Sequence, residues 1–462
     1  MFLAVVLTLF HLGAQRFRCV LLLISSYLFY AYSYWPHLVL LLLVTTVTFV
    51  GSQVLNRRRS PVLLAFVVTL IVLPLVGFKY YNFTAGLVNQ IGVTDLGLLD
   101  VILPIGISFY TFQAISYIAD IFRGAVRINN NFITVALYLA FFPQILAGPI
   151  ERAKNLIPQL EQLVGASIER SYIGVKYLLW GFFCKLVIAD NVALIVDEVL
   201  YAPEHQSGGS FLIVFSLYSF QIYFDFYGYT NIAIGIARLF GVRLNSNFAR
   251  PYLATSIRDF WRRWHITLST WFRDYVYIPL GGHSTRSTTR LAQVLVVFLL
   301  SGLWHGASLN FLAWGGFHGL VYLIEEKVRR YLPPIPPGFP GVLRITVQRC
   351  LTFAGVTFAW ILFRLSDFAD ISLVLARVFY LDTDTPYSAI APLFVQPTTI
   401  VVVTLLASAV ALDYSQAALR LIDRIPETTR EIVAELAVVN WFVVTLGLTS
   451  ASGVRDFIYF RF

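Results

Sequence analysis

Two histidines lie where an imidazole could take part in chemistry, and His305 is the first of them. It stands in the sequence SGLWHGA and follows an apolar run, Leu291 to Leu303, that we expect at membrane depth. Ionisable groups at that depth are costly, and they are usually functional or paired. Desolvation disfavours the imidazolium, so His305 would stay neutral and able to accept a proton. His305 is therefore a candidate general base.

The second histidine, His265, lies in the stretch SIRDFWRRWHITLSTWFRDYVYIPLGG, residues 256–282. Ser256 followed by Asp259 predicts a helix start, and Pro279 followed by two glycines predicts a stop. At 100° per residue, two faces emerge over residues 256–275. The polar face holds Arg258, Arg262, His265, Ser269 and Arg273, and the apolar face holds Phe260, Trp261, Trp264, Leu268 and Trp271. This pattern predicts an amphipathic helix in the membrane interface, and a membrane anchor without chemistry is the alternative interpretation.

The composition indicates a polytopic membrane protein that holds these two histidines among many apolar helices. Of the 462 residues 58% are hydrophobic and only 13% are charged, with a mean hydropathy of +0.73. A soluble protein carries about 25% charged residues. The net charge of +9 fits basic cytoplasmic loops, and the absence of a separate basic domain argues against nucleic-acid binding. The three cysteines show no metal-ligand spacing, so we expect buried thiols and no metal site.

Hydropathy and basic residues together predict an all-α bundle of about eleven spans in a single domain, residues 1–462. Arg57 to Arg59 and Lys327 to Arg330 mark cytoplasmic loops. Proline and glycine in FFPQILAGPI, residues 141–150, predict a broken or re-entrant piece. We expect a polar loop with short helices over residues 190–210, and we interpret Asp225 and Asn231 as turn and cap residues.

Several long motifs resemble one enzyme family. FWRRWHITLSTWFRDYVYIPLGG and GLWHGASLNFLAWGGFHG resemble the signature of the membrane-bound O-acyltransferases. The bacterial alginate O-acetyltransferase (AlgI-like) branch is the most similar part of that superfamily. Further agreement comes from GFKYYNF, LPIGISFYTFQAISYIADIFRG, YFDFYGYTNIAIGIARLFG, NFARPYLATSI and the terminal RDFIYFRF, so that nearly the whole chain is covered.

The resemblance implies the roles of both histidines and the kind of substrate. His305 matches the family's catalytic histidine, and His265 matches its second characteristic histidine. The implied donor is an acyl thioester from the cytoplasm, acetyl-CoA being our expectation, with no permanently bound cofactor. The implied acceptor is a hydroxyl of an exported polysaccharide, reached through a central tunnel or funnel with the help of periplasmic acetyltransferase partners. We expect a multi-pass protein of the bacterial inner membrane, in contact with lipids.

Acyl transfer needs a base for the hydroxyl proton and donors for the oxyanion. The candidate hydrogen-bond donors to the oxyanion are His265, Asn310 and tryptophan indole N–H groups, and the sequence does not choose among them. Related alternatives for the function are O-acetylation of peptidoglycan and D-alanyl transfer to teichoic acid. A transporter or flippase is the alternative from another class, but neither an internal repeat nor ionisable residues spread over many spans supports it.

Overall fold

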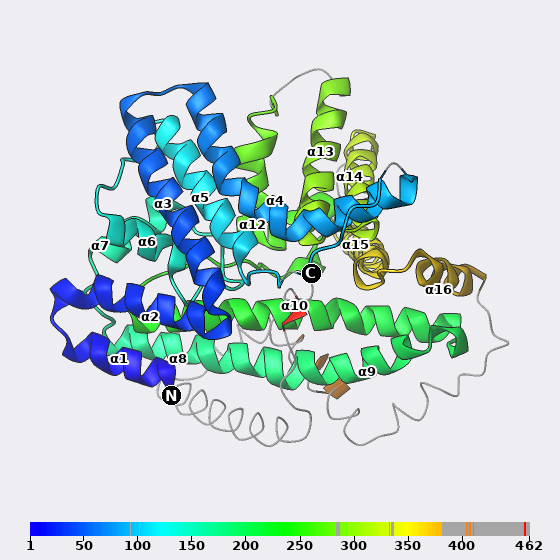
Figure 1. Ribbon diagram of the computed structural model, residues 1–462. Coiled ribbons are helices and arrows are strands. Elements are labelled where there is room, and N and C mark those ends of the chain that lie inside the picture. The colour runs from blue at the N-terminus through cyan, green and yellow to red at the C-terminus, as the bar shows by residue number, and fades with distance from the viewer. Residues whose placement is uncertain are drawn as a thin grey trace, which may run out of the picture. The chain divides into compact units, whose positions relative to one another are not determined.

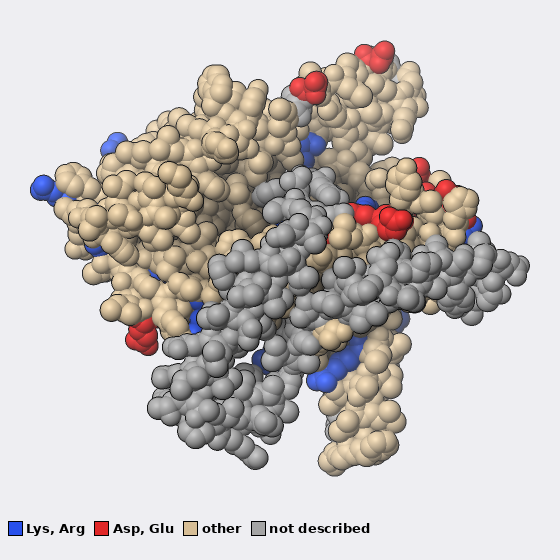
Figure 2. All heavy atoms as spheres, turned by 90° about the horizontal axis from the view of Figure 1, so that it is seen from below, with Lys and Arg blue, Asp and Glu red and all other residues tan. Residues whose placement is uncertain are grey.

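The computed structural model describes residues 1–92, 94–100, 102–282, 287–331, 333, 337–380, 403–404, 406–407, 410 and 457–458. All regular structure in these residues is helical, as the sequence predicts. The predicted spans over residues 398–413 and 434–448 lie outside the described residues, apart from a few isolated positions in the former. Figure 2 shows one face of the molecule, on which the described surface is mostly uncharged.

The chain divides into two compact units. The first comprises residues 1–178, 230–246 and 270–280, and the second comprises residues 179–229, 247–269 and 281–462. The helices that begin in the first unit are α1 (Phe2–Leu12), α2 (Arg18–Ser33), α3 (Trp35–Arg57), α4 (Pro61–Ile91), α5 (Ile107–Phe122), α6 (Phe132–Ala140), α7 (Ala153–Glu161) and α8 (Ile168–Phe182). Within this unit α3, α4 and α5 pack side by side (Figure 1).

The second unit contains most of the later helices. They are the π-helical turn η2 (Phe183–Ala189), α9 (Asp190–Tyr201), α10 (Gly208–Leu239), α11 (Ile257–Arg263), α12 (Ile266–Phe272), α13 (Ser287–His305), α14 (Leu309–Arg329), α15 (Phe339–Arg364) and α16 (Phe368–Tyr380). The end of α10 and the end of α12, with the π-helical turn Arg273–Tyr277 after it, belong to the first unit. Helix α14 packs against both α13 and α15 in the second unit (Figure 1).

Five helical stretches in the described residues are long and apolar enough to cross a membrane. They are Trp35–Arg57, Pro61–Ile91, Ile168–Tyr201, Gly208–Leu239 and Phe339–Arg364. Spans need about 20 residues at 1.5 Å rise each. The protein is therefore an all-helical, multi-pass membrane protein in contact with lipid.

The first unit contains two irregularities of the backbone, and the sequence predicts the one at residues 141–150. Helix α5 begins only at Ile107, because Gly106 has φ of +76° and a Cβ there would lie 2.2 Å from the Ile145 carbonyl oxygen. Helix α6 ends at Ala140, and the FFPQILAGPI segment that follows is not α-helical and is buried. Such backbone is tolerated at membrane depth only where protein surrounds it.

The predicted polar loop with short helices over residues 190–210 is wrong in its first half, which belongs to a long helical stretch. Helix α9 runs from Asp190 to Tyr201 and continues the helix before it. Asp190 is buried, and its Oδ1 lies 2.8 Å from Lys185 Nζ. The amide of Asn191 donates to the Leu186 and Val187 carbonyls. Because these polar groups are satisfied inside the protein, they do not end the helix.

The predicted single helix over residues 256–275 is also wrong, because it is divided into α11, α12 and a π-helical turn. Its start is confirmed, since the Ser256 hydroxyl accepts from the Asp259 N–H at 3.1 Å. Its tryptophans are buried in protein: Trp264 is 1% exposed and Trp271 is 4% exposed. The segment therefore buries its apolar face in the protein, while Arg262 and Arg273 on its polar face are exposed.

Replacing Trp271 with phenylalanine should lower the free energy of unfolding by about 1–2 kcal/mol. In the first unit, the indole stacks on Phe112 at 3.7 Å, and its N–H donates to the Phe112 carbonyl at 2.9 Å. Phenylalanine keeps the stacking but leaves that carbonyl without this donor. Thermal unfolding in detergent would measure the loss, with the exposed Arg262→Ala as control; equal melting temperatures would contradict this account of the packing.

Candidate active site

His265 lies at the break between α11 and α12. Its φ is +44°, a left-handed conformation that is uncommon for residues other than glycine. Asn247 holds the break: its carbonyl accepts from the Ile266 N–H at 2.9 Å, and its side-chain oxygen accepts from the Thr267 hydroxyl at 2.6 Å. Strained positions of this kind persist where the surrounding structure imposes them, and they cluster at functional sites.

The surroundings of His265 differ from those that helical periodicity predicts. The sequence predicts a polar helix face, but the side chain is fully buried. Its ring packs edge-on against Phe226, with centroids 4.7 Å apart, and near Trp304 at 5.9 Å. Burial lowers the pKa of His265 to about 3. The imidazole is therefore neutral at physiological pH and retains one N–H donor.

His305 is the last residue of α13, and it is 3% exposed. Its ring lies edge-on to three aromatic rings, with centroid distances of 4.9 Å to Trp304, 5.0 Å to Trp314 and 5.4 Å to Phe363. Gly306 follows directly, and a Cβ there would meet the Phe311 ring at 2.0 Å. A larger residue after His305 would therefore push the turn out of this packing.

Trp304 links the two histidines. Its ring contacts His265 at 5.9 Å and His305 at 4.9 Å, and all three residues belong to the second unit. The structure thus brings together the two residues that the sequence singles out, although α12 and the whole of α13 separate them along the chain. Two buried imidazoles in one aromatic cluster can supply a proton acceptor and a hydrogen-bond donor for acyl transfer.

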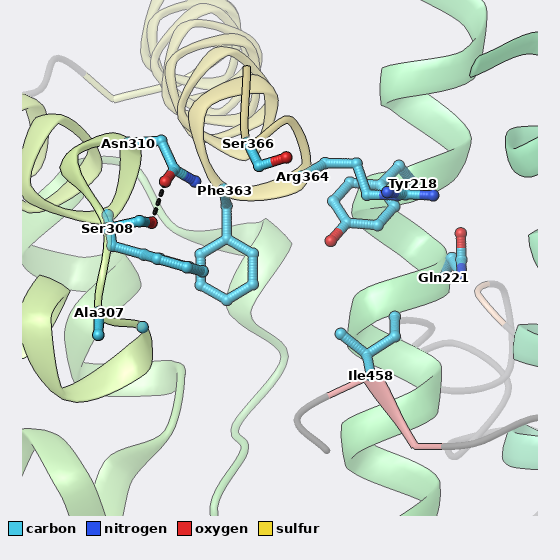
Figure 3. A pocket seen from close by; sticks show the side chains of 11 residues that line it. Tyr218, Gln221, Ala307, Ser308, Asn310, Phe363, Arg364, Ser366 and Ile458 are labelled. Atoms are coloured by element: carbon cyan, nitrogen blue, oxygen red, sulfur yellow. Dashed lines mark hydrogen bonds between the residues drawn. The ribbon is translucent and has the colours of Figure 1, made fainter. Parts of the chain in front are cut away.

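A cavity of about 410 Å³ adjoins His305 in the second unit (Figure 3). Gly306 and Phe363 lie in its wall, and both are neighbours of His305. Asn310 also lines it, but its amide donates to the Leu362 carbonyl at 3.1 Å. One N–H of the Asn310 amide, a candidate oxyanion donor from the sequence, is therefore already used inside the protein. The complete lining is Tyr218, Gln221, Gly306, Ala307, Ser308, Asn310, Phe311, Phe363, Arg364, Ser366 and Ile458.

Asp225 is not a turn residue, in contrast to the interpretation from the sequence. It lies within α10 and is buried, with Oδ1 2.6 Å from Lys185 Nζ. Its Oδ2 accepts from the Ile458 N–H at 2.8 Å. Asn231 likewise lies inside α10 rather than at a helix end. The sequence contained one signal for this arrangement, since a lysine and an aspartate inside apolar spans are each costly unless they are paired.

The arginines of the α11 region mostly have protein partners. Arg263 pairs with Asp259 at 2.9 Å, and Arg258 pairs with Glu326 at 3.4 Å. The Glu325 carboxylate accepts from the Ile257 N–H at 2.8 Å and so caps the start of α11. These contacts fix the helix that precedes His265.

The pH dependence of stability should reflect the buried His265. In the unfolded chain its pKa is near 6.5, whereas burial lowers it to about 3 in the folded protein. Below pH 6.5 the unfolded state therefore binds a proton that the folded state does not bind. The contribution of His265 to the free energy of unfolding is therefore fully present above about pH 6.5. It falls by roughly 1.4 kcal/mol per pH unit as the pH is lowered toward 3.

His265→Asn removes this dependence and tolerates a left-handed backbone. The difference in unfolding free energy between wild type and variant should shrink by about 2 kcal/mol from pH 8 to pH 5. Thermal unfolding of both proteins at the two pH values tests this, because other titrating groups contribute equally to both. A difference that does not change with pH would mean that His265 has the same pKa in the folded and the unfolded protein.

The chain matches one protein-family model and is similar to several individual proteins. Residues 127–366 match the model of the MBOAT, membrane-bound O-acyltransferase family. The probable alginate O-acetylases AlgI of Pseudomonas syringae pv. tomato and Pseudomonas aeruginosa are each 37% identical over 375 residues, 79% of this chain and 70% of theirs. The peptidoglycan O-acetyltransferase of Helicobacter pylori is 34% identical over 316 residues, 62% of this chain and 59% of that protein. The matched family region includes both histidines and most of the cavity lining.

Proposed function

The chain belongs to the membrane-bound O-acyltransferase family, and from this premise we propose that it transfers acetyl groups to hydroxyls of an exported polysaccharide such as alginate. The O-acyltransferase activity follows from the family and from relatives named as O-acetylases. The donor is an acyl thioester, and we propose acetyl-CoA, delivered from the cytoplasm. The similarity to alginate O-acetylases over 79% of the chain supports the choice of acetyl group and polymer.

In the proposed reaction His305 acts as general base. It takes the proton of the acceptor hydroxyl while the oxygen attacks the thioester carbonyl. The tetrahedral intermediate then collapses, the carbon–sulfur bond breaks, and the thiolate leaves and takes up a proton. The observation that carries this role is the position of His305, buried and held by Trp304, Trp314 and Phe363 beside the polar cavity. A buried neutral imidazole is suited to accept a proton at neutral pH.

We propose that His265 stabilises the oxyanion or positions the donor. Its low pKa keeps it neutral, so that it offers an N–H without competing for the proton that His305 accepts. Its fixed left-handed backbone and its contact with Trp304 support a defined ring position. A preorganised donor of this kind typically contributes about 10²–10³-fold in rate.

We further propose that residues 1–462 form one catalytic domain of about eleven spans around a tunnel in the inner membrane. Helix α13 supports this topology, because His305 at its end lies about 22 Å along the axis from the basic residue Arg290 near its start. A donor from the cytoplasm would therefore reach His305 through the protein, and the acyl group would leave toward the outside. Periplasmic acetyltransferase partners would then complete delivery to the polymer.

The proposed function is tested by mass analysis of envelope polysaccharides from cells with and without this gene. We expect acetyl esters on the exported polysaccharide to disappear without the gene and to return when wild type, but not His305→Ala, is supplied. Unchanged acetylation of every exported polysaccharide in the deletion strain would contradict the proposal.

O-acetylation of peptidoglycan is the second candidate, because the Helicobacter pylori relative is named for that activity and is 34% identical. The same experiment separates the two candidates. Loss of acetyl esters from peptidoglycan alone would support the second candidate and exclude the first.

A further inference from the structure

Two residues that are far along the chain from both histidines, Phe457 and Ile458, lie buried in the second unit. Phe457 is 3% exposed and Ile458 is 8% exposed. They belong to the same compact unit as His265 and His305. Their contacts therefore decide whether they serve only the packing of this unit or also its catalytic site.

The ring of Phe457 supports the ring that packs against His265. It stacks on Tyr229, with centroids 4.7 Å apart, and it lies 5.7 Å from Phe226. Phe226 in turn packs edge-on against His265 at 4.7 Å. Protein interiors are packed as densely as organic crystals, so a ring that loses one neighbour shifts toward the space left behind. A single aromatic ring therefore transmits any movement of Phe457 to the imidazole.

The backbone beside Phe457 is fixed to α10 by a buried carboxylate. The Ile458 N–H donates to Asp225 Oδ2 at 2.8 Å, and Asp225 Oδ1 lies 2.6 Å from Lys185 Nζ. Asp225 is 1% exposed, and a buried carboxylate is stable only when its oxygens have donors. Hydrogen bonds to an ionised acceptor are stronger than neutral ones. Because Asp225 and Phe226 are consecutive residues of α10, this bond holds Phe457 close to the ring that it supports.

The side chain of Ile458 reaches the other part of the site. It lies in the wall of the cavity beside His305, on the side of Tyr218 and Gln221 (Figure 3). These two residues also belong to α10. The pair Phe457 and Ile458 thus contacts both the surroundings of His265 and the cavity, through one helix.

We propose that Phe457 is a positioning residue for His265. Phe457 fixes the ring of Phe226, Phe226 fixes the imidazole, and the bond from Ile458 to Asp225 holds Phe457 in place. Correct placement matters because a shift of about 1 Å in a catalytic group can cost about 100-fold in rate. This inference rests on the proposed role of His265 in acyl transfer.

The first test is the kinetics of Phe457→Ala. Transfer of a labelled acetyl group from acetyl-CoA by the purified full chain should show kcat lowered by about 10- to 100-fold. The KM for acetyl-CoA should stay unchanged, the signature of an interaction made only in the transition state. Phe457→Leu keeps most of the apolar volume and should recover most of kcat. Phe353→Ala is the matched control: it also removes a phenyl ring from the second unit, but one that contacts Phe220 and Tyr252, so kcat should stay at the wild-type value.

The second test is a double-mutant cycle with His265→Ala. If Phe457 acts through the imidazole, Phe457→Ala should lower kcat in the wild type but have no further effect once His265 is alanine. Asp225→Ala gives the same cycle without changing an aromatic ring, since it removes the acceptor of the Ile458 N–H and leaves Lys185 paired with Asp190 at 2.8 Å. The test therefore stands even where Phe457→Ala does not fold.

The proposal would be overturned by Phe457→Ala with the same kcat as Phe353→Ala. An equal fold-loss from Phe457→Ala, or from Asp225→Ala, in the wild type and in His265→Ala would also overturn it, because the effect would then not pass through the imidazole. Failure of the proposed role of His265 is distinguishable: His265→Ala would then transfer acetyl groups at the wild-type rate by itself.

Discussion

Replacing His305 with alanine should leave a folded, membrane-inserted protein that has lost acyl transfer by about 10²–10⁴-fold, the usual contribution of a general base. The side chain lies among the rings of Trp304, Trp314 and Phe363 and beside the cavity. Its removal opens a small space among these aromatic rings. The expected loss is therefore in the chemical step and not in folding.

The measurement is transfer of a labelled acetyl group from acetyl-CoA by purified protein, with thermal unfolding as the check on folding. His265→Ala serves as comparison, and we expect a smaller loss because an oxyanion donor typically contributes less than a base. The exposed Arg262→Ala should keep wild-type activity. Near-wild-type transfer by a well-folded His305→Ala would remove the base from the mechanism.

The two histidines could be found from the sequence because each carries a local signal. His305 ends an apolar run, and His265 lies among arginines and tryptophans within long family motifs. Their meeting at Trp304 could not be derived from periodicity, because it depends on how α12 packs against the end of α13. The left-handed backbone of His265 was likewise hidden, since Asn247 imposes it from a different segment of the chain.

The errors at residues 190–201 and in α10 have a common physical cause. Polar residues in apolar stretches, such as Asp190, Asp225 and Asn231, were interpreted as signs of loops and turns. In the structure Asp190 and Asp225 meet Lys185 inside the protein, so that α9 and α10 continue through them. A charged side chain favours water-exposed loops and turns because burial without a partner is costly. A partner of opposite charge from another part of the chain removes that cost, so the residue can lie inside a buried helix.

The cavity shows the same limit at the site itself. Arg364 and Gln221 stand in apolar helices without any motif that marks them, and Asp197 lies in the stretch for which a loop was expected. Only packing brings them to one place in the second unit. The sequence therefore predicts the two histidines, whereas the lining of the cavity beside them can be found only from the tertiary structure.

Replacing Lys185 with methionine should lower the free energy of unfolding by about 3–5 kcal/mol, the typical result of breaking a buried ion pair. Lys185 Nζ lies 2.6 Å from Asp225 Oδ1 and 2.8 Å from Asp190 Oδ1, and all three side chains are buried. Methionine fills most of the space of the lysine stem, so the loss reports the missing charge between two carboxylates and not a cavity. The lysine stands in the π-helical turn Phe183–Ala189, and such turns often occur at functional positions.

Thermal unfolding in detergent would compare this variant with Arg263→Ala, which breaks the partly exposed pair with Asp259 at 2.9 Å. Exposed pairs contribute only about 0–1 kcal/mol, so the two variants should differ clearly in melting temperature. Combining Lys185→Met with Asp225→Leu and Asp190→Leu should recover much of the loss, because apolar replacement of a whole buried ion cluster is often neutral. If Lys185→Met melts like Arg263→Ala, the two carboxylates do not depend on the lysine. If Lys185→Met is unstable and the triple variant is not, the balance of charges among Lys185, Asp190 and Asp225 stabilises the position of α10. Tyr218, Gln221 and Phe226 lie on the same helix.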